Sequence, residues 1–173
     1  MKRWHMLTLV GTDRPGIVAA LTGTLFRAGC NLGEASMARL SGNFTIMLML
    51  ETGADQAHIR ALLEPVARDF DLHLHLDEIQ AHPHQHLQPN VQVVVHGADR
   101  AGIVAEVTGV LAHAGLNILE LESDVGGTQD HPIYIMLLAG YAAGGIAALE
   151  PALAPLRLGG IEVCLTAIDA LIG

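Results

Sequence analysis

Two short stretches of the chain place an aspartate, an arginine and a glycine just before a predicted helix. Residues 13–16 read Asp-Arg-Pro-Gly, and residues 99–102 read Asp-Arg-Ala-Gly. The first turn of a helix leaves backbone N–H groups unpaired and carries a partial positive charge, so a carboxylate binds well there. A glycine lets a ligand approach the backbone closely, and an aspartate accepts hydrogen bonds from an ammonium group. Each stretch therefore offers groups for both charged ends of a free amino acid.

A purely structural interpretation of the same residues stays open at this stage. Aspartate is a common N-cap residue, and the glycines would then only permit tight packing of the helix on a sheet. Asn31 and Asn117 follow the glycines that end the predicted helices, Gly29 and Gly115. Each asparagine is either a ligand contact or a turn residue that tolerates left-handed geometry.

Both stretches belong to an internal repeat that covers most of the chain. Residues 11–31 and 97–117 match in register at a constant offset of 86 residues. The Glu-Pro pair at 64–65 recurs at 150–151 with the same offset, so the repeat reaches the second predicted helix. Such self-similarity at one offset indicates a duplicated domain.

The elements that position these stretches follow from the spacing of apolar residues and from turn residues. The first copy is predicted to contain strand 4–11, a helix from the Pro15 turn to Gly29, strand 31–40, strand 44–51, helix 56–70 and strand 72–79. Strand 44–51 is apolar on both faces, which predicts that both faces are covered. Pro65 is expected to kink the second helix. Gly23 and Gly109 recur inside the first helix, where a glycine costs about 1 kcal/mol relative to alanine, so they predict a close helix contact.

The β-α-β-β-α-β order predicts the α+β class, with two ferredoxin-like domains that each have a four-stranded antiparallel sheet and both helices on one face. The domains are expected at 1–79 and 91–173, joined by a polar linker over 80–90. Hydrophobic residues make up 51% of the chain and charged residues 16%, and a domain of this size buries only roughly 60% of its unfolded surface. We therefore expect the halves to pack side by side, with 11–31 facing 97–117, and the chain to form a homodimer.

Charge and cysteine content narrow the class of partner and compartment. The net charge is −9 and no cluster of Lys and Arg occurs, which disfavours direct binding to nucleic acid. Cys30 and Cys164 stand at non-equivalent positions of the repeat and are interpreted as buried thiols in a reducing compartment. No signal peptide is expected in residues 1–10, and no apolar run reaches the roughly 20 residues that span a bilayer. These features favour a soluble cytoplasmic protein without a membrane partner.

Metal binding and catalysis find little support in the sequence. His82, His84 and His86 alternate in the linker, close to His73 and His75, and imidazoles bind zinc, copper or nickel. Their spacing fits no standard structural zinc site, so a solvated polar linker is favoured over a metal site. No nucleophile elbow, P-loop or H-E-x-x-H motif occurs. We therefore expect no catalytic residues, no metal site and no cofactor.

The segments DRPGIVAALTGTLFRAGCNL and DRAGIVAEVTGVLAHAGLNI resemble the opening of ACT domains, which are βαββαβ modules that sense small molecules. The resemblance covers both halves of the chain. In amino-acid-binding members the effector touches the loop before the first helix of one domain and the asparagine after the first helix of another. The resemblance thus implies one site from Asp13, Arg14, Pro15, Gly16 and Ile17 with Asn117, and a second from Asp99, Arg100, Ala101, Gly102 and Ile103 with Asn31. Ala101 stands where the first loop has Pro15, which leaves the equivalence of the two sites open.

The function that the resemblance implies is regulatory. A chain of two ACT domains without a catalytic domain resembles ACT regulators of transcription. It is expected to sense a small amino acid, with glycine as a candidate, and to control transcription of amino-acid metabolism through protein–protein contact. The alternative is a separately encoded regulatory subunit of an amino-acid or one-carbon enzyme. The expected partner is therefore a transcription regulator or a metabolic enzyme.

Overall fold

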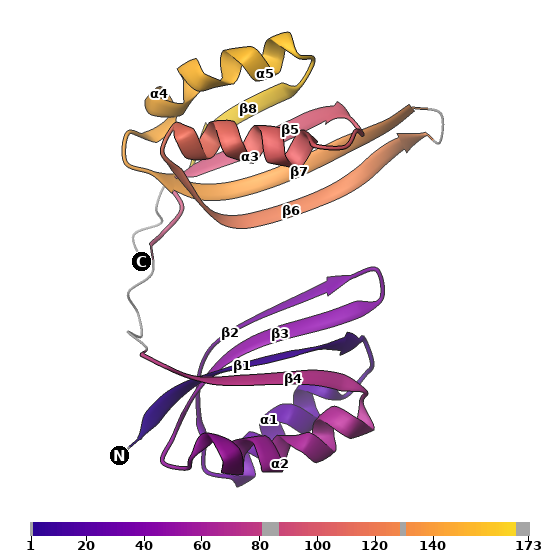
Figure 1. Ribbon diagram of the computed structural model, residues 1–173, viewed down its shortest axis with the longest axis vertical. Helices are drawn as coiled ribbons and strands as arrows, with labels where there is room; N and C mark the ends of the chain where they lie inside the picture. The colour runs from indigo at the N-terminus through magenta and orange to yellow at the C-terminus, as the bar shows by residue number, and fades with distance from the viewer. Residues whose placement is uncertain (1, 81–86, 129–130, 169–173) are drawn as a thin grey trace. The chain divides into compact units, whose positions relative to one another are not determined.

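The computed structural model describes residues 2–80, 87–128 and 131–168, and the chain divides into two compact units (Figure 1). The first unit is Met1–Gln85 and the second is His86–Gly173. Each unit has its own hydrophobic core. Within the described ranges no helix has the length and apolar character needed to cross a membrane.

The first unit has the predicted βαββαβ order. Its elements are β1 (Arg3–Thr12), α1 (Ile17–Arg27), β2 (Asn31–Leu40), β3 (Asn43–Thr52), α2 (Gln56–Asp69) and β4 (Leu72–Ile79). The strand order in the sheet is β2-β3-β1-β4, and every neighbouring pair is antiparallel. Both helices cover the same face of the sheet (Figure 1). The ferredoxin-like prediction is therefore confirmed for this unit.

The second unit repeats this order with a divided second helix. Its strands and first helix are β5 (Val91–Ala98), α3 (Ile103–His113), β6 (Leu116–Thr128), β7 (His131–Ala142) and β8 (Glu162–Ala167), with the antiparallel sheet order β6-β7-β5-β8. The second helix consists of α4 (Gly145–Leu149), the 3-10 turn η1 (Glu150–Leu153) and α5 (Ala154–Leu158). Pro151 and Pro155 stand at the starts of η1 and α5, and each lacks the N–H that a continuous helix needs.

Only one face of each sheet carries the core. Along β3, Phe44, Ile46, Leu48 and Leu50 alternate toward the helices and are buried. Met47 points to the other face and is 48% exposed. The prediction that both faces of this strand are covered is therefore wrong for the described unit, because α1 and α2 pack on the same side (Figure 1).

The one-sided packing also overturns two smaller expectations. Cys164 is exposed because it faces away from the helices on β8, so the prediction of buried thiols is right only for Cys30. Among the residues that the structure describes, Gly23 and Gly109 do not mark close helix contacts. A Cβ built at Gly23 would meet only Arg27 Nη1, at 3.4 Å, and one built at Gly109 would meet no described atom within 4 Å.

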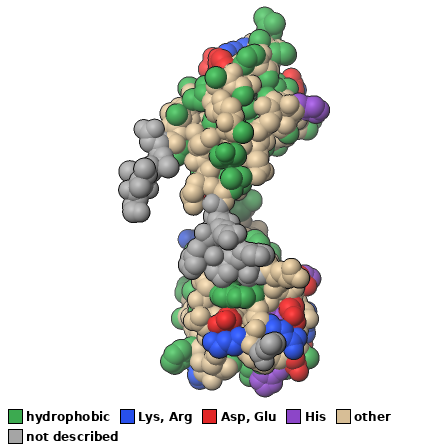
Figure 2. Space-filling model, turned by 90° about the vertical axis from the view of Figure 1, so that its left-hand side faces the viewer, with side chains coloured by type: hydrophobic (Ala, Val, Ile, Leu, Met, Phe, Trp, Pro, Cys, Tyr) green, Lys and Arg blue, Asp and Glu red, His purple; other side chains and the backbone are tan. Residues whose placement is uncertain are grey.

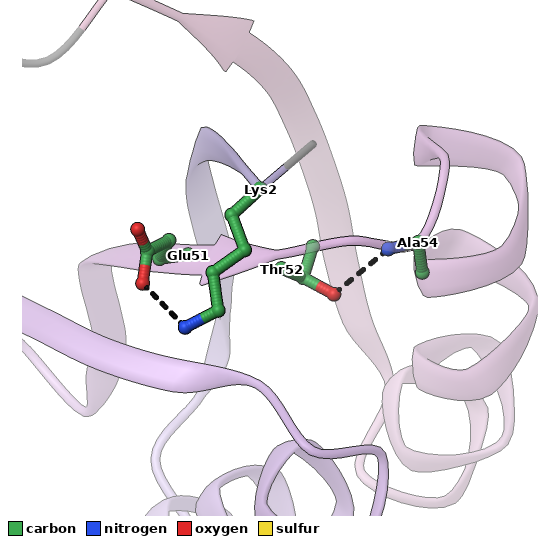
Figure 3. Close-up of polar contacts among 4 residues, drawn as sticks. All are labelled: Lys2, Glu51, Thr52 and Ala54. Carbon is green, nitrogen blue, oxygen red and sulfur yellow. Dashed lines mark hydrogen bonds and ion pairs between the residues drawn. The ribbon is translucent and has the colours of Figure 1, made fainter.

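Polar contacts link the residue before β1 to β3, and the end of β3 to the turn before α2. Lys2 Nζ lies 3.1 Å from Glu51 Oε2, and the backbone N–H of Ala54 donates to Thr52 Oγ1 at 3.1 Å (Figure 3). Figure 2 shows Lys or Arg side chains lying next to Asp or Glu side chains on the visible face of the first unit.

Candidate functional site

The loop before α1 is held to the β2–β3 hairpin. The backbone N–H of Asp13 donates to the carbonyl of Gly42 at 2.9 Å. Gly16 has a φ of +93°, a left-handed conformation that residues with a Cβ rarely adopt. The chain turns at Gly16, and α1 begins only at Ile17. Pro15 therefore precedes the helix, and the prediction that this helix begins at the Pro15 turn is wrong.

Asp13 does not cap the helix. Neither α1 nor α3 has a side-chain hydrogen bond at its N-cap, so the capping interpretation of Asp13 and Asp99 is wrong. The left-handed Gly16 occupies the N-cap position of α1, three residues beyond the aspartate. The Asp13 carboxylate instead pairs with Arg39 of β2, with 2.6 Å between Oδ2 and Nη2.

Arg14 is engaged at the end of α2. Its Nη1 donates to the carbonyl of Asp69 at 3.1 Å, and its guanidinium carbon lies 5.4 Å from the centre of the Phe70 ring. A cation above an aromatic face is attracted by the negative charge density of the ring. The first loop thus has two arginines nearby. Arg14 is held at the end of α2, and Arg39 forms an ion pair with Asp13.

These residues line a groove of about 540 Å³ on the first unit. The loop and the start of α1 contribute Asp13, Arg14, Gly16 and Ile17. The structure therefore brings together four of the five residues predicted in this loop, while Pro15 is not among the lining residues. Met37, Arg39 and Phe44 also line the groove, and the sequence did not predict them. They face the loop because β2 and β3 form a hairpin there. The sequence offered only one sign of this wall of the groove, an arginine near the end of strand 31–40.

The second loop has a similar backbone and different side-chain contacts. Ala101 and Gly102 form the turn, Gly102 has a φ of +89°, and α3 begins at Ile103. Arg100 pairs with Glu106 of α3 rather than with the second helix of its unit. The arginine of this loop is therefore held by the same helix that the loop introduces.

The position of Arg39 has no basic counterpart in the second unit. Val125 on β6 lies 86 residues after Arg39 and pairs with β7 as Arg39 pairs with β3. The backbone N–H of Asp99 donates to the carbonyl of Pro132 at 3.3 Å, which ties this loop to the β6–β7 hairpin. The position equivalent to Arg39, which pairs with the Asp13 carboxylate in the first unit, is therefore a valine in the second unit.

The two asparagines stand at the beginning of the second strand of each unit. Asn31 and Asn117 are exposed, and the left-handed positions before them belong to Gly29 and Gly115, with φ values of +70° and +93°. The turn interpretation of the asparagines is therefore wrong, and the predicted glycine stops are confirmed. Asn31 lies at the opposite end of β2 from Arg39, so the structure does not bring it to the loop of its own unit.

The histidines form no metal centre in the part of the chain that is described. His73 and His75 are exposed on β4, and His75 Nε2 lies 2.7 Å from Asp77 Oδ2. The linker histidines over 82–86 lie outside the described residues. Among the residues that the structure does describe, no group of three or more His, Cys, Asp or Glu side chains is placed to hold a metal ion.

Comparison with known proteins places both units in one family. Two family models, each of an ACT domain, match residues 5–77 and 91–140. The glycine cleavage system transcriptional repressor of Escherichia coli is 29% identical over 123 residues, which cover 70% of this chain and 65% of that protein. The chain therefore spans slightly less than two thirds of that relative. The UPF0237 protein YjhC of Lactococcus lactis is 35% identical over 72 residues, which cover 41% of this chain and 83% of that protein.

Two crystal structures share the fold over nearly the whole chain. An unknown protein from Galdieria sulphuraria has a TM-score of 0.80 at 23% identity, covering 98% of this chain and 100% of that chain. A structure assigned provisionally to the glycine cleavage system transcriptional repressors has a TM-score of 0.74 at 22% identity, covering 98% and 99%. Because each unit has the βαββαβ order and matches an ACT domain model, this chain belongs to the ACT domain family.

Proposed function

We propose that this chain is a non-catalytic regulator that senses a small amino acid and controls transcription of amino-acid metabolism through contact with another protein. The observation that carries the proposal is the Asp-Arg-x-Gly-Ile loop, which recurs in both ACT domains and lines a groove in the first. Glycine is the first candidate ligand, because the Escherichia coli relative is a glycine cleavage system transcriptional repressor.

The chemistry of the loop suits an α-amino acid. The start of α1 has no side-chain cap, so its first N–H groups and the helix dipole favour a carboxylate. Asp13 lines the same groove, and its carboxylate is an acceptor for an ammonium group. Both charged ends of an amino acid therefore find a complement within one loop.

We propose further that each complete site needs the asparagine of another ACT domain, as the resemblance to amino-acid-binding members implies. Asn117 would complete the loop over 13–17, and Asn31 would complete the loop over 99–103 if that second loop also binds a ligand. Both asparagines are exposed and so are accessible to a ligand or a second domain. Asn31 stands away from the loop of its own unit, which is what a site built from two domains requires.

Calorimetry with free glycine tests the ligand. We expect binding to the wild-type chain. Asn117→Ala should remove one polar partner, worth about 0.5–1.5 kcal/mol or roughly 2- to 13-fold in affinity. Gln88→Ala, at an exposed polar residue outside both loops, is the control and should bind like wild type. Unchanged affinity in Asn117→Ala contradicts the two-domain site, and a lack of binding by every free amino acid contradicts the sensing function.

Co-purification tests the partner. A transcription regulator captured by the chain supports the proposal, whereas an amino-acid or one-carbon enzyme supports the alternative of a separately encoded regulatory subunit. The net charge of −9 should prevent selective binding to duplex DNA by the purified chain at physiological salt. Tight, sequence-selective binding by the chain alone in a gel-shift assay would contradict control through protein contact.

A further inference from the structure

Asp13 and Arg39 form an ion pair that lines the groove of the first ACT domain. Asp13 Oδ2 lies 2.6 Å from Arg39 Nη2, and both residues line the groove. The Asp13 side chain is 25% exposed and the Arg39 side chain 67% exposed. Ion pairs this accessible to water contribute little net stability, so a ligand can separate them at low cost.

An amino-acid zwitterion carries the complements of both partners. Its carboxylate fits the planar fork of an arginine, which donates two parallel hydrogen bonds. Its ammonium group fits the aspartate carboxylate. Ile17 and Phe44 are buried and line the same groove, so a small apolar side chain would contact their surface. The groove thus offers charges of both signs and an apolar floor.

Arg14 is not the arginine that meets the ligand in this arrangement. Its guanidinium already donates to the carbonyl of Asp69 and lies over the Phe70 ring. Those contacts are with α2 and would have to break before Arg14 could hold a carboxylate in two hydrogen bonds. Within the described residues Arg39 pairs only with the partly exposed carboxylate of Asp13, and it lines the groove from β2.

The second ACT domain lacks this ion pair. Val125 stands where the first domain has Arg39, and Arg100 is paired with Glu106. The carboxylate of Asp99 can still accept from an ammonium group. No arginine of β6 lies at the position equivalent to Arg39, where it could bind the carboxylate of the same ligand.

We propose that the zwitterion of a small amino acid binds by inserting between Asp13 and Arg39, and that the chain therefore binds one amino acid, at the first domain only. This inference rests on the proposed sensing function and specifies its site. Arg39 is the residue that determines specificity for a free α-carboxylate. The second domain does not bind a ligand in this way.

Calorimetry with glycine, alanine and serine on the full chain tests the proposal. We expect one molecule bound per chain, and affinity at least tenfold lower for acetate and for methylamine, which each carry only one of the two charges. Arg39→Val introduces the residue of the second domain and should lower glycine affinity at least tenfold. Arg3→Val is the matched control, because Arg3 is likewise an exposed strand arginine, and it pairs with Glu78 at 2.9 Å outside the groove. It should bind like wild type.

The outcomes separate this inference from the proposed function. Glycine binding that is equal in Arg39→Val and wild type overturns the Asp13–Arg39 site and leaves amino-acid sensing intact. Two equal sites per chain also overturn it. A lack of binding by all three amino acids overturns both. The thermal midpoint of Arg39→Val should match wild type, since Arg39 is exposed, and Arg39→Lys should recover part of the affinity because it keeps the charge without the planar fork.

Discussion

Replacing His5 with leucine is expected to stabilise the first unit. His5 lies on β1 with 0% of its surface exposed, and neither ring nitrogen has a hydrogen-bond partner among the described residues. Glu78 stands opposite His5 in the β1–β4 register, but its carboxylate accepts from Arg3 at 2.9 Å. The repeat places Val91, which is fully buried, at the corresponding position of the second unit. An apolar side chain is therefore compatible with this place in the fold.

The magnitude follows from the unpartnered imidazole. A buried polar group without a hydrogen bond costs about 1–3 kcal/mol on the scale of protein mutations. Leucine is similar in volume to histidine, and repacking after such a swap usually costs less than about 1.5 kcal/mol. The net gain in the free energy of unfolding should therefore be about 1–2 kcal/mol. For a domain of 60–100 residues each kcal/mol shifts Tm by about 4–8 °C, so the expected increase is about 5 °C or more.

The assay can follow the first unit alone. Trp4 is the single tryptophan of the chain and neighbours His5 on β1, so its fluorescence reports the unfolding of this unit. His73→Leu is the control, because His73 is exposed on β4, and surface changes usually stay within about 0.5 kcal/mol. A fall in Tm for His5→Leu, with His73→Leu unchanged, would refute the reasoning and mean that the imidazole contributes net stability in solution.

Three further substitutions test the local geometry by urea unfolding. Gly109→Ala should stabilise the second unit by about 0.5–1 kcal/mol, since a Cβ there meets no described atom within 4 Å. A loss of stability would mean that another part of the protein covers this face of the helix. Gly102→Ala should destabilise the same unit by about 1–2 kcal/mol, because φ is +89°, and a neutral effect would contradict the left-handed turn. Asp55→Ala should cost about 1 kcal/mol, because the Asp55 carboxylate accepts from the His58 N–H at 2.8 Å at the start of α2, and an unchanged midpoint would contradict that cap.

The secondary structure was predictable because apolar spacing and turn residues agree in this chain. Leu7 and Leu9 alternate along β1, while Ile17, Leu21 and Leu25 recur every four residues along α1, and all five are buried. Each spacing fits only one type of element. Pairing of the strands then follows from the short connections and the right-handed crossovers.

The contacts of the candidate site were less predictable because they depend on strands that meet only in the folded sheet. The sequence leaves a capping role for Asp13 open, because it does not show that Gly16 takes the left-handed N-cap position. The approach of Arg39 to Asp13 is not predictable from the sequence, because the β2–β3 hairpin sets the distance between them. The exposure of Cys164 likewise depends on which face of β8 the helices cover.

Comparing the two domain copies distinguishes positions that the backbone conformation requires from positions that ligand binding requires. Gly16 and Gly102 recur because both loops require a left-handed residue directly before the helix. Arg39 and Val125 differ although their strands pair in the same way, so the fold does not require either side chain. A position that the fold leaves free, and that carries a charge in only one copy, is where two copies of a domain can differ in what they bind. The functional difference between the two domains is therefore expected at Arg39 rather than at the repeated aspartate.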